Sequence, residues 1–244
     1  AATVSFKKTG MDDYFNDVSI TGPRFERNVA EHFSVGGKEP EGFKAWVAQA
    51  PAARAAYGFV TNYIGYMSPN FFVIRGDTTS GVHGPASGGQ MLAVSYALFI
   101  AGLAAIIPRL RRDKSARLIL WWVLIFPVAA SLTDWGRQHA IRSITALPVI
   151  EIAAAIGLVS LATLLSKRTS FSFAAVAAAA LIAVSADASS HFHSYFNEYP
   201  AESAAPFKYG FREGFEFVNE RRNDYKSVIV ADLIPYIYSY IFFY

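Results

Sequence analysis

Cysteine is absent from this 244-residue chain, and charged residues are scarce. The lack of cysteine excludes disulfides, thiolate metal ligands and a cysteine nucleophile. Charged residues make up 17% of the sequence, against about 25% in an ordinary soluble domain, which argues against disorder, a coiled coil or a typical cytosolic enzyme. The net charge of +3 gives no support for nucleic-acid binding. The sequence also has no phosphate-binding glycine loop, dinucleotide-binding fingerprint or serine nucleophile elbow.

Apolar residues, by contrast, make up 53% of the chain and are concentrated in four runs. The runs are Gln90–Ile107, Leu118–Thr133, Ser143–Leu165 and Phe171–Ala186. A helix needs about 20 residues to cross a bilayer, so the first and third runs are long enough and the other two are slightly short. Apart from Glu151 in the third run, charges lie only between the runs. Strand-like alternation is also lacking, and both features favour membrane helices over a soluble core or barrel strands. We therefore predict a mainly α, polytopic membrane protein with four transmembrane helices.

The charges between the runs predict the orientation of the chain. Cations cluster in the first and third connections: Arg109, Arg111, Arg112, Lys114, Arg117, Lys167 and Arg168. The connection 134–142 carries only Arg137 and Arg142. The positive-inside rule places the large cluster in the cytoplasm and the connection 134–142 on the other face of a bacterial inner or plasma membrane. Three parts follow: an extracytoplasmic segment 1–89, a transmembrane region 90–186, and a second extracytoplasmic segment 187–244.

Both extracytoplasmic segments are predicted to mix helices and strands. The predicted helices are Glu41–Ala50, Pro51–Tyr66 and Gly210–Arg222, and the predicted strands are Thr3–Phe6 and Lys226–Ala231. The Gly- and Pro-rich stretch Ser68–Gln90 is predicted to be a loop. Because Ala1 is not a methionine and Tyr244 closes an apolar stretch, we expect a fragment of a longer protein, with the last segment cut short.

Four ionisable residues share the short outer connection: Asp134, Arg137, His139 and Arg142. Cations at a membrane surface bind lipid phosphate, and arginine does so through two parallel N–H hydrogen bonds. Arginines at helix ends also anchor the helix by reaching to the interface, and spacing alone does not distinguish the two roles. The candidate phosphate-binding residues are therefore Arg137, His139 and Arg142.

Other polar residues give weaker signals. Arg75, Asp77 and His83 lie together in the Gly-rich loop, although an Asp that follows Gly76 is commonly structural. Glu151 lies about 12 Å into the third run at 1.5 Å per residue, so it is either a functional carboxylate or the partner of a basic residue elsewhere. The acidic pair Asp12-Asp13 is predicted to lie in a surface turn rather than in a catalytic site. His191 and His193 have no third ligand nearby in the sequence, so no metal site is predicted.

Several short stretches of the sequence resemble a known family. The stretch 62–72 (Asn-Tyr-Ile-Gly-Tyr-Met-Ser-Pro-Asn-Phe-Phe), followed by Arg75-Gly76-Asp77 and His83, resembles the extracytoplasmic loop of bacterial membrane glycosyltransferases. These are similar to the dolichyl-phosphate-mannose–protein mannosyltransferases of the GT-C superfamily. The resemblance covers roughly residues 57–244. It includes Gly88-Gly89-Gln90, Arg142 before Ala146-Leu147-Pro148, His193-Ser194-Tyr195-Phe196 and Tyr199-Pro200.

The resemblance implies a multi-span hexosyl- or mannosyl-type enzyme of the cell envelope. It would transfer a sugar from a polyprenyl-phosphate donor to a protein, lipid or glycan acceptor on the extracytoplasmic face, in contact with membrane lipids and with no nucleic acid. The family's catalytic carboxylate lies in the first outer loop of the full protein, and no residue here matches that motif. We therefore expect this fragment to lack the catalytic carboxylate, and the catalytic residue is unknown. The sequence identifies no cofactor and leaves a divalent metal requirement open. The alternative is a non-catalytic transporter or polysaccharide-assembly subunit, in which Glu151 would matter most.

Overall fold

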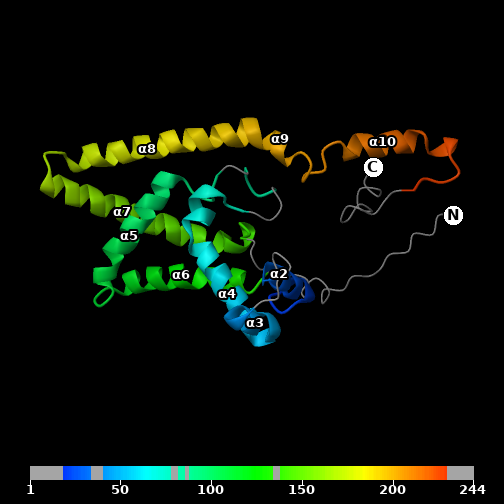
Figure 1. Cartoon of the computed structure of the whole chain (residues 1–244). Coiled ribbons are helices and arrows are strands. Elements are labelled where there is room, and N and C mark those ends of the chain that lie inside the picture. The colour runs from blue at the N-terminus through cyan, green and yellow to red at the C-terminus, as the bar shows by residue number, and fades with distance from the viewer. Residues whose placement is uncertain (1–18, 34–40, 78–81, 86–87, 134–137, 230–244) are drawn as a thin grey trace.

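The structure, a computed structural model, describes residues 19–33, 41–77, 82–85, 88–133 and 138–229, which are mainly helical (Figure 1). The longer helices are α2 (Pro23–Phe33), α3 (Gly42–Gln49), α4 (Pro51–Met67), α5 (Ala93–Ile106), α6 (Lys114–Ser131), α7 (Leu147–Arg168), α8 (Phe173–His193) and α10 (Phe211–Glu220). Shorter turns are η1 (Asn70–Ile74), η2 (Ile107–Arg109), η3 (Ile141–Ala146), η4 (Ser194–Glu198), α9 (Tyr199–Ser203) and η5 (Arg222–Asp224). The predicted mainly α class is confirmed. The described ranges hold no strand, only an isolated bridge between Ser19 and Thr133.

Helices α5 to α8 coincide with the four apolar runs. Three helical stretches within the described residues are long and apolar enough to cross a membrane: Lys114–Ser131, Ile141–Arg168 and Phe173–Ser203. The stretch Ala93–Arg109 is shorter. From the sequence, the second and fourth runs were predicted to be the shorter spans. In the structure the helix of the first run is the shorter one. The reason is that the N–H groups of residues 89–91 donate to carbonyls of residues 71–73, which keeps this segment out of α5.

The two basic connections lie at the same end of the helical body. Figure 1 shows the α5–α6 and α7–α8 turns on the left, whereas helices α2 and α3 lie toward the other end. Asp113 caps α6 by accepting a hydrogen bond from the N–H of Ser115, and Ser172 caps α8 in the same way through Ala175. The side of a membrane that this end faces stays a prediction from the positive-inside rule.

Helices α5 and α7 cross in close contact through glycines. A β-carbon built at Gly102 would overlap the carbonyl oxygen of Ala153, and one built at Gly157 would overlap that of Leu98. Small residues let helix backbones approach closely, which is how membrane helices associate without a hydrophobic driving force between them. The crossing therefore depends on the absence of side chains at these two positions.

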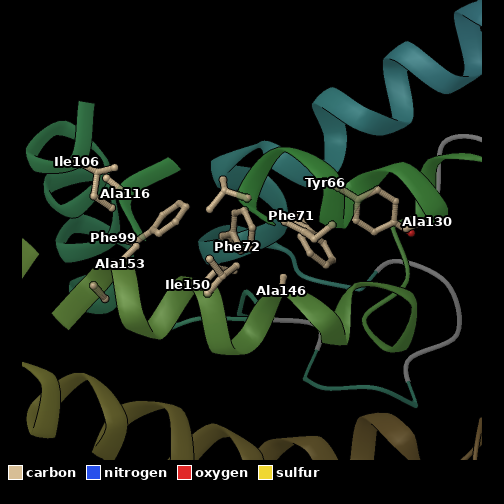
Figure 2. Packing of buried hydrophobic residues seen from close by; sticks show 14 residues of the cluster. Tyr66, Phe71, Phe72, Phe99, Ile106, Ala116, Ala130, Ala146, Ile150 and Ala153 are labelled. Atoms are coloured by element: carbon tan, nitrogen blue, oxygen red, sulfur yellow. The ribbon is translucent and has the colours of Figure 1, made fainter. Parts of the chain in front are cut away.

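The main buried cluster joins these helices to the turn η1. Phe71 and Phe72 in η1 are each 2% exposed, and Figure 2 shows them packed beside Phe99 and Ile150. The sequence predicted a loop over the whole of Ser68–Gln90. That prediction is wrong for Asn70–Ile74, which forms a π-helical turn because burial of the two phenylalanines anchors it to the core.

The predictions for the outer segments have mixed outcomes. Helices α3, α4 and α10 confirm the three predicted helices to within two residues at each end. The predicted strand Lys226–Ala231 is not formed over residues 226–229, which have no ladder partner within the described ranges, and residues 230–231 lie outside them. The predicted strand Thr3–Phe6 and the acidic pair at 12–13 also lie outside the described residues.

Candidate functional site

Three side chains from two distant loops meet in one cluster. Asp77 and His83 belong to the loop that follows η1, and His139 belongs to the connection between α6 and α7. The Nδ1 atom of His83 lies 2.9 Å from Oδ2 of Asp77, and Nδ1 of His139 lies 3.8 Å from the same oxygen. The sequence had assigned these residues to two separate groups. The structure brings them together, and we call the three residues the Asp-His-His cluster.

The backbone around the cluster is held by specific contacts. Gly76 has φ +64°, and a β-carbon there would lie 2.9 Å from the carbonyl oxygen of Gly88, so a glycine is required where the chain turns into Asp77. Oδ2 of Asp77 then accepts a hydrogen bond of 2.7 Å from the N–H of Ala140. The N–H of His139 donates to the hydroxyl of Tyr66 at 2.9 Å. These bonds fix the 138–142 connection over the end of α4.

The cluster is partly shielded from water. The Asp77 side chain is 3% exposed, whereas the side chains of His83 and His139 are 18% and 20% exposed. The two imidazole centroids are 4.5 Å apart. Burial lowers the pKa of His139, the Asp77 carboxylate opposes this shift, and the charges of Arg142 and His83 add to it. A lowered pKa favours the neutral imidazole, which is the form that binds metal ions. One ligand atom from each of the three residues lies within 4.8 Å of the other two, so the cluster has the dimensions of a metal site.

An apolar pocket of about 250 Å³ opens beside the cluster. His83 contributes one wall, and the remaining walls come mainly from η1, the segment 90–91, η3 and the start of α7. The lining residues are Phe71, Phe72, His83, Gln90, Met91, Ala140, Ile141, Ser143, Ile144, Ala146, Leu147 and Ile150. Figure 2 shows how Phe71 and Phe72 face Ile150 and Ala146 across the core. An ionisable group thus borders an apolar cavity, which suits an amphiphilic ligand.

The other predicted site residues are more dispersed. Arg142 is partly buried, and its Nη1 donates to Oγ1 of Thr133 at 2.7 Å. Arg75 is exposed at the end of η1. Arg137 lies outside the described residues, as does Asp134.

Glu151 lies within the helical stretch Ile141–Arg168, which is long and apolar enough to cross a membrane. Because Ile141–Ala146 forms the separate turn η3, α7 begins at Leu147, and Glu151 lies in the first turns of that helix, about 6 Å along its axis. Its side chain is exposed and has no hydrogen bond or ion pair with another described residue.

A second pocket, of about 350 Å³, lies between residues 88–93 and the end of α8. His191, His193 and Glu198 line it. Asp187 in the same wall is engaged, since its Oδ2 accepts a hydrogen bond from the N–H of Val94 and so caps α5 from a neighbouring helix. Within the described ranges, only the Asp-His-His cluster gathers three metal-ligating side chains.

Tyr66 is a site residue that sequence reasoning missed. It is 1% exposed, so neither its burial nor its contact with a loop 73 residues away could be inferred from local spacing. The one available signal was its position inside the motif 62–72.

Comparisons with protein-family models, curated proteins and solved structures gave no match. The function is therefore inferred from the geometry of the cluster and pocket, and from the resemblance of the stretch 62–72 and the residues that follow it.

Replacing Tyr66 with phenylalanine is expected to loosen the 138–142 connection. The His139 amide would lose its acceptor inside a shielded region, at a cost of about 1–2 kcal/mol. Hydrogen exchange of that amide should accelerate about tenfold. Tyr63→Phe is the matched control on the same helix, since its hydroxyl donates to the carbonyl of Leu124 instead. Equal acceleration of the His139 amide in both variants would contradict the role assigned to Tyr66.

Proposed function

We propose that this chain is part of an integral-membrane glycosyltransferase that takes a sugar from a polyprenyl-phosphate donor on the extracytoplasmic face. The observation that carries the proposal is the apolar pocket bordered by His83, with the partly buried Arg142 nearby. A polyprenyl phosphate has the matching character, because its hydrocarbon chain requires an apolar cavity and its phosphate requires cations or N–H donors at the mouth. The resemblance of the stretch 62–72 and the residues that follow it to this enzyme class supports the same assignment.

In this proposal the cationic residues act on the phosphate. Breaking the bond between sugar and phosphate leaves extra negative charge on the phosphate oxygens, and a guanidinium held close to them lowers the barrier. Arg137 and Arg142 are the candidates for this role, and His139, in the same connection, is the third candidate for binding the phosphate. Arg142 lies between the pocket-lining residues Ile141 and Ser143, and its Nη1 donates to Oγ1 of Thr133, which restricts the conformations of its side chain.

Asp77 is not assigned the role of general base. Its carboxylate is 3% exposed and is engaged by the N–H of Ala140. A base that deprotonates an acceptor hydroxyl has to reach that hydroxyl within about 3 Å. Asp77 is therefore a positioning residue for the two loops, and the catalytic carboxylate is still unidentified in this chain.

Blocking the pocket tests the hydrocarbon part of the proposal. Leu147→Trp places an indole at a pocket-lining, half-exposed position of α7, so it should fill the cavity with little disturbance of the core. Excluding even two methylenes of the ligand costs about 1.6 kcal/mol, so photocrosslinking to a diazirine-bearing polyprenyl phosphate in nanodiscs should fall at least about tenfold. Leu164→Trp is the matched control, because Leu164 is similarly exposed near the far end of the same helix.

A second pair of variants tests the binding of the donor phosphate. Arg142→Gln should weaken the same crosslinking, whereas Arg117→Gln, in the first turn of α6 at the basic connection, should not. The corresponding polyprenol, which lacks the phosphate, should compete poorly against the probe. Unchanged labelling of Leu147→Trp, or competition by the polyprenol as strong as that by the phosphate, would reject the proposed donor site.

A further inference from the structure

Two ring nitrogens in the Asp-His-His cluster lack hydrogen-bond partners. The Nδ1 atoms of His83 and His139 are both buried, and neither has a hydrogen-bond partner among the described residues. Both lie near the same oxygen of Asp77, at 2.9 and 3.8 Å, and that oxygen already accepts the N–H of Ala140. Buried polar atoms are normally satisfied, so two unsatisfied atoms facing one carboxylate require an explanation.

Protonating both imidazoles would not resolve the problem. Their ring centroids are only 4.5 Å apart, so two imidazolium charges would repel each other at a site that holds one carboxylate. Two neutral imidazoles instead place two unprotonated ring nitrogens within 3.8 Å of one carboxylate oxygen. A cation between these three atoms would be bound by all three side chains at once.

We propose that Asp77, His83 and His139 form a binding site for a divalent transition metal of the zinc class. Two imidazole nitrogens and one carboxylate oxygen are a donor set that zinc accepts in tetrahedral sites. Ligand atoms that are about 2.0–2.1 Å from zinc lie roughly 3.3 Å from one another, and the 2.9 and 3.8 Å separations bracket that value. Calcium and magnesium prefer all-oxygen sites, so the two nitrogens argue against them.

The proposed ion has two consequences that follow from the position of its ligands. It would join the loop after η1 to the connection before α7, which are 63 residues apart at the Asp77–Ala140 contact. It would also have one coordination position without a protein ligand, beside the pocket that His83 lines. The metal would therefore both fix the two loops and offer a Lewis-acidic position at the pocket mouth.

Metal stoichiometry on the purified full chain tests the proposal without any lipid substrate. The chain is stripped with a chelator in detergent, dialysed against a zinc buffer and measured by elemental analysis. We expect one tightly bound zinc per chain. Cobalt substitution should give the visible absorption of a four-coordinate N/O site. Because the readout contains no polyprenyl phosphate, failure here leaves the proposed donor pocket untouched, and failure of the donor test leaves this site untouched.

Variants identify the ligands. His83→Ala and His139→Ala should each weaken zinc binding by more than about 100-fold, since losing even an outer-shell partner costs 10–100-fold. Asp77→Asn keeps an oxygen that can accept the Ala140 N–H, so the variant can fold while losing the charged ligand. His191→Ala and His193→Ala are the controls, because both histidines lie outside the cluster. Absence of stoichiometric zinc in the unmodified chain, or equal losses in the control variants, would overturn the site in favour of a metal-free cluster.

Discussion

Replacing Gly157 with alanine is expected to lower the free energy of unfolding by about 3 kcal/mol, at the upper end of overpacking effects. The added methyl group would overlap the backbone carbonyl of Leu98 and would lie 2.7 Å from the backbone nitrogen of Gly102. Backbone atoms cannot rotate aside as a side chain can, so α5 and α7 would have to separate. The contact between these two helices is more extensive than any other between described elements, and the whole cluster around Phe99 and Ile150 would loosen with it.

The same substitution elsewhere provides the control. Gly214 lies in the exposed helix α10, where an added methyl group would have no other atom within 4 Å, so Gly214→Ala should be neutral or raise helix stability by a few tenths of a kcal/mol. Gly102→Ala should resemble Gly157→Ala, because it meets the carbonyl of Ala153. Reversible unfolding in mixed micelles by denaturing detergent measures all three. A stable Gly157→Ala variant would mean that α5 and α7 do not cross as closely as described.

The second large effect is expected from Asn62→Leu. Asn62 is 1% exposed, and its Nδ2 donates to the carbonyls of Ser131 and Thr133 at 3.3 and 2.8 Å. These carbonyls belong to the end of α6 and the segment just beyond it, where helical partners run out. Leucine has a similar volume and no donor, so two shielded carbonyls would lose their partner at a total cost of about 3 kcal/mol.

Asn197→Leu is the control for Asn62→Leu, because it makes the same substitution at an exposed position. The Asn197 side chain also donates to a backbone carbonyl, that of His193, but it is exposed, so water replaces the lost bond. The unfolding transition of Asn197→Leu should match that of the unmodified chain to within about 0.5 kcal/mol. If both variants lost the same stability, the burial of Asn62 would not be the cause.

The helices were predictable because their signals are local. Pro51 begins α4 as a first-position proline should, and Asp113 and Ser172 cap the helices that follow them. The segment 70–74 was mistaken for part of a loop, because Gly and Pro on both sides gave a loop-like composition. The burial of Phe71 and Phe72 that makes it helical depends on α5, α6 and α7.

The candidate site was only partly predictable. His139 and Arg142 were chosen for a cationic connection, and Asp77 and His83 for a Gly-rich loop, and each choice was reasonable by itself. The shared cluster could not be inferred, since no periodic pattern links residues in loops that lie on either side of two helices. Tyr66 and Asn62, which hold the second loop and the end of α6, look in the sequence like ordinary members of an amphipathic helix.

The sequence by itself determined the helical, strongly apolar character of the chain, the positions of the four apolar segments and the grouping of cations between them. Those properties depend on neighbours within a few turns, so composition and spacing are enough to fix them. Only the tertiary structure decided that Gly102 faces α7, that Phe71 and Phe72 are buried, and that Asp77 meets His83 and His139. These depend on how each helix is rotated and where each loop returns, which contacts between residues far apart in the sequence determine.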